Sequence, residues 1–572
     1  MSASDKKKLR KEQRVAAMTK KQQAAAKEAK KVKAYTLTFI TAIILCIAVV
    51  IGVILSPVID GVIRKNSHAI TVGNHELSAV ELSYFYVDAI TEHQQEVYNN
   101  YYGTFGNYWS YMLGYDTSKP LNEQIKDSES GDNWADYFID KAIENAKSVY
   151  ALYDDAMTKD YKLTESEQKE LDEAIDSLSA MATYYGYSST ESYLRATYGN
   201  GANEDTYKEY YTLSTIASSY YDDYHENLEY EVEDYRAYET DKYNDFSSYS
   251  YVYYTVNYNA YLGEGTKDEN GTTTWTEDEK NAAREAAKKD MEILLAAGIA
   301  DKETFDKAVQ GLEINALDPD DKEATAPTAY EVKDKLYTDI VLHEDAVTWL
   351  AEKERQPGDI ASFAMTTTTS TDKIPEDHEH SDDCGHELVT NGYYVVLFTG
   401  MTNNEIHLVN VRHILVAFEG GTKDSNGNVT YSVKEKEKAK TEAEKLLQQW
   451  KDGNATENAF AELANKESDD LGGKVTNGGL YEDIYPGQMV EAFEDWCFAE
   501  GRQAGDTGIV ETEYGYHVMY FSSTDEMSYR DYMIDIVMAN EDLEEWHDDL
   551  VEKIKATVVD LSKMEYDLIV NG

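Results

Sequence analysis

The longest run of apolar positions lies near the N-terminus, between residues 35 and 55. These 21 residues include no charged side chain, and about 20 apolar residues span a bilayer as a helix. Residues 1–33, ahead of the run, carry twelve Lys or Arg side chains and three acidic ones. By the positive-inside rule, we expect a basic cytoplasmic tail over residues 1–34, a transmembrane helix over residues 35–56 and an extracytoplasmic remainder.

A cleaved signal peptide and a lipoprotein signal are the alternatives for this run. The run is longer than the roughly 7–15 apolar residues of a signal peptide, and no A-x-A-like cleavage site follows Leu55. Cys46 lies mid-run behind Leu45, where a lipidation motif needs a small residue. These features favour an uncleaved membrane anchor.

Helical periodicity dominates residues 66–245. Ser78 and Glu81 form a predicted capping box ahead of apolar residues on one helical face, and Thr164 and Glu167 repeat this pattern. We therefore expect a mostly helical domain. Tyrosines cluster in it, at Tyr184, Tyr185, Tyr187, Tyr220, Tyr221 and Tyr224. Exposed tyrosines would offer amphipathic contact area to unfolded segments, whereas buried ones would fill the core, and the pattern leaves both open.

The second half of the chain contains an internal repeat. A turn at residues 265–271 recurs at 421–427, and a capping box follows each copy. Further matches are Trp349 with Trp496, Arg355–Asp359 with Arg502–Asp506, and Gly392–Phe398 with Gly515–Phe521. The repeat predicts two α+β domains, over residues 246–400 and 407–525. Residues 526–572 would form a C-terminal helix that packs on the helical domain.

Composition narrows the possible functions. Apolar residues make up 42% of the 572, which is too many for a disordered chain. The net charge is −55, and the basic tail of +9 leaves −64 for the other residues, which would repel nucleic acid phosphates. Three cysteines cannot form a disulfide framework. We expect a folded α+β multidomain protein that does not bind nucleic acid.

The second α+β domain carries an ordered series of motifs. In chain order they are Val411–Val416, Ser468–Asp470, Gly478–Leu480, Gly487–Met489 with Phe493, and Thr512–His517. The series resembles the parvulin-type peptidyl-prolyl cis/trans isomerases. The flanking regions resemble, more weakly, the extracytoplasmic foldases PrsA and SurA, in which a helical chaperone module accompanies parvulin domains. The resemblance implies an active isomerase domain over residues 407–525 that needs no cofactor.

The chemistry of prolyl isomerisation explains these residue types. Rotation about an X-Pro amide crosses about 20 kcal/mol without making or breaking a covalent bond, so catalysis needs a suitable environment rather than a nucleophile. By resemblance, an apolar slot for the proline ring is lined by Leu480, Met489 and Phe493. The same resemblance assigns paired imidazoles to His413 and His517, oriented by Asp470, Thr512 and Tyr514.

Each of these residues also has an ordinary structural interpretation. His413 and His517 stand in strand-like apolar patterns, where a buried histidine with satisfied hydrogen bonds is common. Asp470 alone would suit a solvated turn. After Gly479, the Asp-Leu-Gly typical of the family is replaced by Leu480-Tyr-Glu-Asp-Ile, which leaves the shape of the slot open.

The first α+β domain lacks this chemistry. Tyr394 stands at the position of His517, and residues 251–257 contain no histidine to match His413. We therefore expect a degenerate domain that serves for binding or as a spacer. A polar insertion in this domain contains ligand types for Zn²⁺ or Cu²⁺, namely His378, His380, Cys384 and His386. Their spacing matches no standard zinc site, and a solvated acidic loop is the alternative.

Together these features predict a single-pass cell-membrane protein with an extracytoplasmic prolyl isomerase and chaperone function. Its partners would be unfolded or newly translocated polypeptides that contain X-Pro bonds. Two other functions remain open. One is a catalytically inactive holdase or scaffold with a parvulin fold, and the other is a metal-binding surface protein.

Overall fold

The computed structural model describes residues 6–8, 56–128, 130–267, 271–316, 325–368, 388–423, 429–470, 477–566 and 568. The chain divides into two compact units, Met1–Leu228 with Ala539–Gly572, and Glu229–Met538. The apolar run at residues 35–55 and the candidate metal ligands at 378–386 lie outside the described residues. Among the helices that are described, none combines the length and apolar character needed to cross a bilayer.

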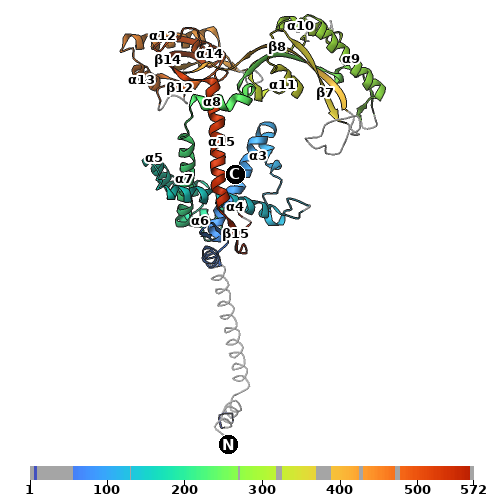
Figure 1. The fold of residues 1–572 in the computed structure, drawn as a ribbon. Helices are drawn as coiled ribbons and strands as arrows, with labels where there is room; N and C mark the ends of the chain where they lie inside the picture. The colour runs from blue at the N-terminus through green and yellow to red at the C-terminus, as the bar shows by residue number, and fades with distance from the viewer. Residues whose placement is uncertain are drawn as a thin grey trace, which may run out of the picture. The chain divides into compact units, whose positions relative to one another are not determined.

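The first unit is mostly helical, and its helices run from blue to teal in Figure 1. They are α3 (Ala79–Phe105), α4 (Trp134–Thr158), α5 (Glu165–Tyr184), α6 (Thr190–Tyr198) and α7 (Glu204–Glu226), with short 3₁₀ turns at Gly106–Met112 and Leu121–Glu123. Both predicted capping boxes are present, with Ser78 at the start of α3 and Thr164 at the start of α5. The local polar pattern therefore sets where these helices begin.

The C-terminal segment of the chain completes this unit. A three-stranded sheet has the order β15-β1-β2, in which β15 (Ala556–Val558) pairs with β1 (Ile70–Val72) and β1 pairs with β2 (His75–Leu77). The long helix α15 (Tyr529–Lys553) brings Trp546 and Leu550 against apolar residues of α4 and α7. This burial ties the last part of the chain to the helices near its beginning.

The clustered tyrosines divide between core and surface. Tyr220 is 7% exposed and belongs to an apolar cluster. Tyr224 stacks on Trp546 with ring centroids 3.8 Å apart. In contrast, Tyr184 is 84% exposed and Tyr185 53% exposed. Both interpretations of the tyrosine-rich sequence therefore hold, each for different residues.

The second unit contains two four-stranded antiparallel sheets of the same topology. The first has the order β6-β3-β8-β7 and the second β12-β9-β14-β13. The strands of the first are β3 (Ser248–Asn257), β6 (Tyr330–Leu336), β7 (Ile360–Thr368) and β8 (Leu388–Thr402). Those of the second are β9 (His407–Ala417), β12 (Leu480–Ile484), β13 (Thr507–Glu511) and β14 (Gly515–Ser528). The shared strand order is the structural counterpart of the sequence repeat.

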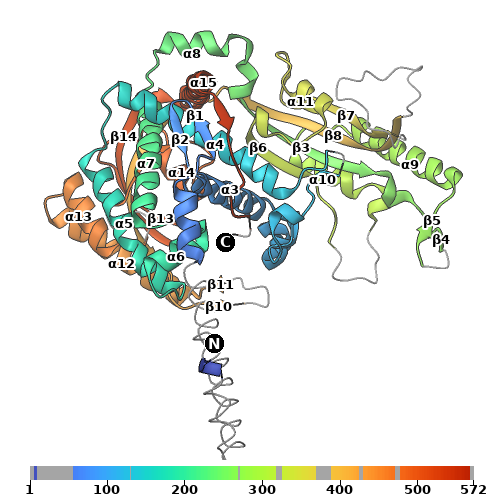
Figure 2. The same cartoon turned by 90° about the horizontal axis from the view of Figure 1, so that it is seen from below.

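Helices flank both sheets. In the first domain they are α9 (Glu277–Ala296), α10 (Lys302–Gln310) and α11 (Glu344–Leu350), and α9 packs on β3 and β8 (Figure 2). In the second domain they are α12 (Val433–Asp452), α13 (Glu457–Glu467) and α14 (Glu491–Cys497). The repeated turns form small hairpins, β4 (Thr266–Lys267) with β5 (Thr273–Thr274), and β10 (Thr422–Lys423) with β11 (Val429–Thr430).

Local contacts repeat as well. The guanidinium of Arg355 lies 3.9 Å from the ring centroid of Trp349, and that of Arg502 lies 3.9 Å from the ring centroid of Trp496.

A Cβ added at Gly515 would lie 2.2 Å from the carbonyl oxygen of Val416 on the paired strand. Glycine is therefore required where β9 and β14 approach so closely.

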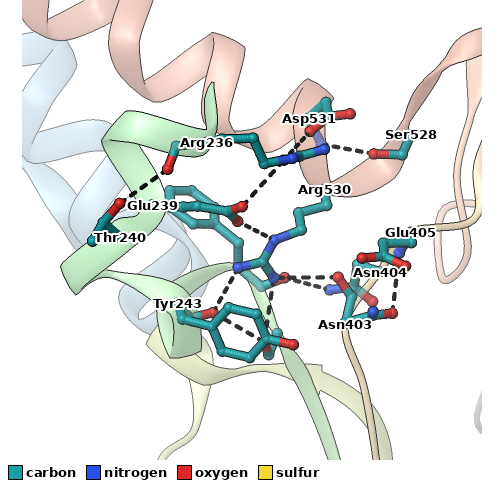
Figure 3. A network of polar contacts seen from close by, with 12 residues as sticks. Arg236, Glu239, Thr240, Tyr243, Asn403, Asn404, Glu405, Ser528, Arg530 and Asp531 are labelled. Carbon is teal, nitrogen blue, oxygen red and sulfur yellow. Dashed lines mark hydrogen bonds and ion pairs between the residues drawn. The ribbon is translucent and has the colours of Figure 1, made fainter. Parts of the chain in front are cut away.

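A buried arginine joins three segments of the second unit (Figure 3). Arg530, at the start of α15, is 2% exposed and pairs with Glu239, which follows α8 (Val232–Tyr238). Its Nη atoms also donate to carbonyl oxygens of Tyr243 at 2.9 Å, Phe246 at 3.1 Å and Asn403 at 3.2 Å. The entry to β3, the link between the two α+β domains and the start of α15 therefore meet at one side chain.

Candidate functional site

Strand alternation places the two predicted histidines on one face of the second sheet. Successive residues of a strand point to opposite faces, so His413 shares its face with Val411, and His517 shares its face with Met519. Val411 and Met519 pack in the apolar cluster that includes α14, whereas Ile414 and Val518 pack against α12 and α13. The histidines are thus on the α14 face of the sheet.

A continuous series of hydrogen bonds runs through His413 and His517. His413 Nδ1 lies 2.9 Å from His517 Nδ1, and His413 Nε2 lies 2.9 Å from Asp470 Oδ2. At the other end, His517 Nε2 lies 2.8 Å from Thr512 Oγ1. Asp470 Oδ2 also accepts from the hydroxyl of Tyr481 at 2.8 Å. Both imidazoles are buried, at 3% and 6% exposed.

One assignment of protons satisfies every contact in this series of hydrogen bonds. The carboxylate of Asp470 can only accept, so His413 donates from Nε2 and its Nδ1 accepts from His517 Nδ1. His517 Nε2 then accepts from the hydroxyl of Thr512, whose oxygen accepts the backbone N–H of Tyr514 at 3.2 Å. Asp470 therefore orients the tautomers of both histidines.

Local backbone contacts hold Asp470 in place. The hydroxyl of Ser468 accepts the backbone N–H groups of Leu415 at 3.1 Å and Asp470 at 3.2 Å. The backbone N–H of Asp469 donates to the carbonyl of Leu415 at 2.8 Å. The Ser-Asp-Asp segment is thereby fixed against β9, two residues beyond His413.

The electrostatics of the site favour a neutral ring at His517. Burial, followed by the charge of His413, lowers the pKa of His517 to about 4, although Asp470 opposes this shift. Burial and the hydrogen bond to Asp470 raise the pKa of Tyr481 to about 12. At neutral pH, His517 is therefore uncharged and Tyr481 remains a hydrogen-bond donor.

Apolar side chains of α14 and the segment before it cover the imidazoles. The ring of Phe493 lies edge-on to both, with centroids 5.6 Å from His413 and 5.4 Å from His517. Met489 is half-buried and packs in the same cluster. Cys497 is 1% exposed in this cluster, and burial raises its thiol pKa to about 12. It is therefore poorly suited to act as a nucleophile.

Two of the predicted site residues lie differently from expectation. Leu480 pairs with Arg412, and Arg412 binds Glu457 of α13, so Leu480 belongs to the face opposite the histidines. The expectation that Leu480 lines the slot is therefore corrected. Tyr514 contributes its backbone N–H, while its side chain is 58% exposed.

Tyr481 is the site residue that the sequence did not reveal. It pairs with Val411 on the histidine face, and its ring centroid lies 5.0 Å from that of His413. The alternation of side chains along a strand would have pointed to it, because only one of two adjacent residues faces the histidines. The altered sequence after Gly479 obscured that register.

The first domain has tyrosines at the two histidine positions. Met519 pairs with His413 in the second sheet, and Val396 pairs with Tyr253 in the first, so Tyr253 corresponds to His413. Tyr394 corresponds to His517. The two tyrosine rings lie 6.2 Å apart in an edge-to-face arrangement. This pair cannot reproduce the imidazole chain of the second domain.

Comparison with known proteins finds a family match over the domain that contains this site. Residues 393–524 match the family described as the PPIC-type PPIase domain. The chain is 42% identical over 60 residues to foldase protein PrsA 1 of Listeria innocua, which is 10% of this chain and 20% of that protein. It therefore spans about a fifth of the length of this curated relative.

Solved structures with similarity include PrsA proteins. The crystal structure of PrsA from Bacillus anthracis is 20% identical, with 26% of this chain and 59% of that chain covered and a TM-score of 0.17. A structure from Campylobacter jejuni, from work on the SurA-like chaperones PEB4 and Cj1289, is 23% identical. The match covers 27% of this chain and 57% of that chain, with a TM-score of 0.16.

The chain thus contains a parvulin-type peptidyl-prolyl isomerase domain. The predicted resemblance to parvulins and to PrsA is confirmed over the matched residues.

Proposed function

We propose that residues 407–525 catalyse cis/trans isomerisation of X-Pro bonds in unfolded polypeptides. The observation that carries this proposal is the buried chain from Asp470 through His413 and His517 to Thr512, covered by Phe493. An apolar slot beside polar groups of fixed orientation favours a twisted amide over a planar one. No covalent step is needed.

The roles of the residues follow from the geometry. Phe493 and Met489 would hold the pyrrolidine ring against the sheet. The neutral imidazole of His517 offers the substrate amide a hydrogen-bonding group that carries no full charge. Tyr481 and Asp470 would act as positioning residues that fix the tautomer of His413.

A matched pair of substitutions tests this proposal. Met489→Ala in the full-length protein should lower kcat/KM on an X-Pro tetrapeptide by about tenfold or more in a protease-coupled assay. The repeat offers a control, Leu342→Ala, at the corresponding position of the first domain, and it should leave the rate unchanged. Equal losses from both substitutions, or from neither, would contradict the assignment of activity to the second domain.

We further propose that the protein is an extracytoplasmic foldase anchored in the cell membrane through residues 35–56. The support is the uncharged run behind a basic tail and the similarity to a foldase protein. Protease added to intact cells or protoplasts should digest residues 60–572. Protection of these residues until lysis would exclude the topology.

Chaperone activity of the helical unit is part of this proposal. Its surface exposes tyrosine rings, including Tyr108 at 70%, Tyr111 at 80% and Tyr184 at 84%. Such rings offer contact area at low cost in side-chain entropy.

A further inference from the structure

The helical unit contains a cavity whose lining residues are distant in sequence from those of the isomerase site. It has a volume of about 470 Å³ and lies among α3, α4, α7 and α15. Its apolar wall consists of Phe85, Val149, Leu152, Ala217 and the rings of Tyr210 and Tyr221. This size suits one large side chain of a bound polypeptide, with room for water.

The charged groups that line the cavity are acidic. Asp88 and Glu92 lie on α3, while the described lining includes no Lys or Arg. Among the lining residues that the structure describes, only His547 has a side chain that can become cationic, and its Nε2 lies 2.7 Å from Ser148 Oγ. An apolar cavity with two carboxylates and no permanent cation is complementary to a cation on an apolar stem.

Asp88 is held in position at the aromatic wall. The hydroxyl of Tyr210 donates to Asp88 Oδ2, and the Tyr210 ring meets Phe85 edge to face at 5.1 Å. Glu92 accepts from the side-chain amide of Asn145 at 2.9 and 3.1 Å. Both carboxylates are therefore oriented before a ligand arrives, which lowers the entropic cost of binding.

Burial removes water from the carboxylate of Asp88, and the protein replaces this solvation only in part. Burial, with a smaller contribution from Glu92, raises the pKa of Asp88 to about 6, and the Tyr210 hydrogen bond only partly offsets this. A cation placed beside Asp88 would replace the lost solvation of the carboxylate.

We propose that this cavity binds the arginine side chain of an extended client polypeptide. Arginine fits better than lysine because its planar guanidinium can face a carboxylate and stack on a tyrosine ring while its methylene stem covers the apolar wall. The inference deepens the proposed chaperone function and rests on it. A basic client is also what the −55 net charge of the chain would attract.

A second cavity extends the surface available to such a client. It has a volume of about 730 Å³ and shares Phe85 and Tyr210 with the first. Because both cavities are lined by this aromatic pair, an extended chain with its arginine in the first can direct a neighbouring residue toward the second.

A peptide pair tests the proposal with the full-length protein in detergent. One fluorescein-labelled, N-acetylated octapeptide contains a single arginine among Gly and Ser, and the other carries citrulline, its uncharged isostere, at the same position. Fluorescence anisotropy should show about tenfold tighter binding of the arginine peptide. Asp88→Asn should remove this difference, whereas Asp172→Asn, on the exposed surface of α5, should keep it.

Two further measurements separate the possible outcomes. Should Asp88→Asn fail to fold by circular dichroism, Ser218→Trp, an exposed lining position, should block the cavity and abolish the preference for arginine. Equal binding of both peptides, or a preference that survives these substitutions, would overturn the proposal. Isomerase rate and suppression of client aggregation are measured on the same preparations. If the unmodified protein shows both activities but no preference for the arginine peptide, the cavity site is rejected and the proposed foldase function stands.

Discussion

At the scale of single residues, the site depends on one acceptor at the end of a hydrogen-bond chain. Asp470 fixes the donor nitrogen of His413, and His413 in turn fixes that of His517. A carboxamide in place of the carboxylate can donate as well as accept, so it no longer selects one tautomer.

Asp470→Asn should therefore lower kcat/KM for the X-Pro tetrapeptide by about tenfold, which corresponds to about 1.4 kcal/mol of lost transition-state stabilisation. Tyr481→Phe should give a smaller loss in the same assay, because it removes one donor to Asp470 and leaves His413 in place. Tyr514→Phe serves as the control, since this exposed side chain leaves the backbone donor in place. A rate for Asp470→Asn equal to that of the unmodified protein would show that tautomer selection is not needed.

The lowered pKa of His517 makes the second domain sensitive to acid. The unfolded histidine titrates near 6.5 and the folded one near 4. Below pH 6.5 the unfolded state binds a proton that the folded state excludes, so the unfolding free energy falls as pH drops from about 6.5 to about 4, and no such loss occurs above pH 6.5.

Hydrogen exchange at the amides of β14 should report this loss as about 2 kcal/mol between pH 7 and pH 5, after correction for intrinsic exchange. In His517→Asn the contribution disappears, so the difference between the two proteins isolates it from other carboxylates and histidines. An identical pH dependence in both proteins would argue that His517 is already charged in the fold.

At the scale of elements, the repeat made much of the second unit predictable. Two copies with glycine, tryptophan and arginine at matching positions and with matching capping-box residues indicate two similar α+β domains before any strand pairing is known. The order of the strands, β6-β3-β8-β7 and β12-β9-β14-β13, then follows one plan. Helix starts were also predictable because capping is a local interaction.

What the sequence concealed depends on register and on contacts between distant segments. The side-chain direction of Leu480 and Tyr481 follows from their pairing with Arg412 and Val411, which no local pattern reveals. Likewise, the partners of Arg530 are separated from it by more than one hundred residues.

Arg530 offers a test of how strongly such a contact stabilises the second unit. Arg530→Leu would leave several buried carbonyl groups without their donor and would break the buried ion pair with Glu239, which keeps its contact with Arg236. Breaking a buried ion pair in this way costs about 3–5 kcal/mol. Chemical denaturation followed by tryptophan fluorescence should show this loss. Arg236→Leu is the matched control, because Arg236 is 44% exposed in its pair with Asp531 and should cost about 1 kcal/mol or less. Similar losses from both substitutions would mean that the buried ion pair of Arg530 stabilises the unit no more than the exposed pair of Arg236.

At the scale of the whole molecule, catalysis and client holding are expected to be separable. The isomerase site requires a small slot in the second unit, whereas the three most exposed of the described tyrosines, Tyr108, Tyr111 and Tyr184, belong to the helical unit. His413→Ala combined with His517→Ala should therefore remove the isomerase activity of the full-length protein yet leave its suppression of aggregation of a denatured client, followed by light scattering.

The converse substitution tests whether particular exposed tyrosine rings are responsible for holding clients. Tyr108→Ser with Tyr111→Ser removes two side chains that are 70% and 80% exposed, so it should weaken suppression of aggregation by severalfold without changing the fold or the isomerase rate. Tyr330→Ser, at a position 63% exposed in the first α+β domain, controls for the loss of any exposed tyrosine. If the histidine double variant also loses all protection while remaining folded, the helical unit does not hold clients by itself, and the protein acts as an isomerase alone.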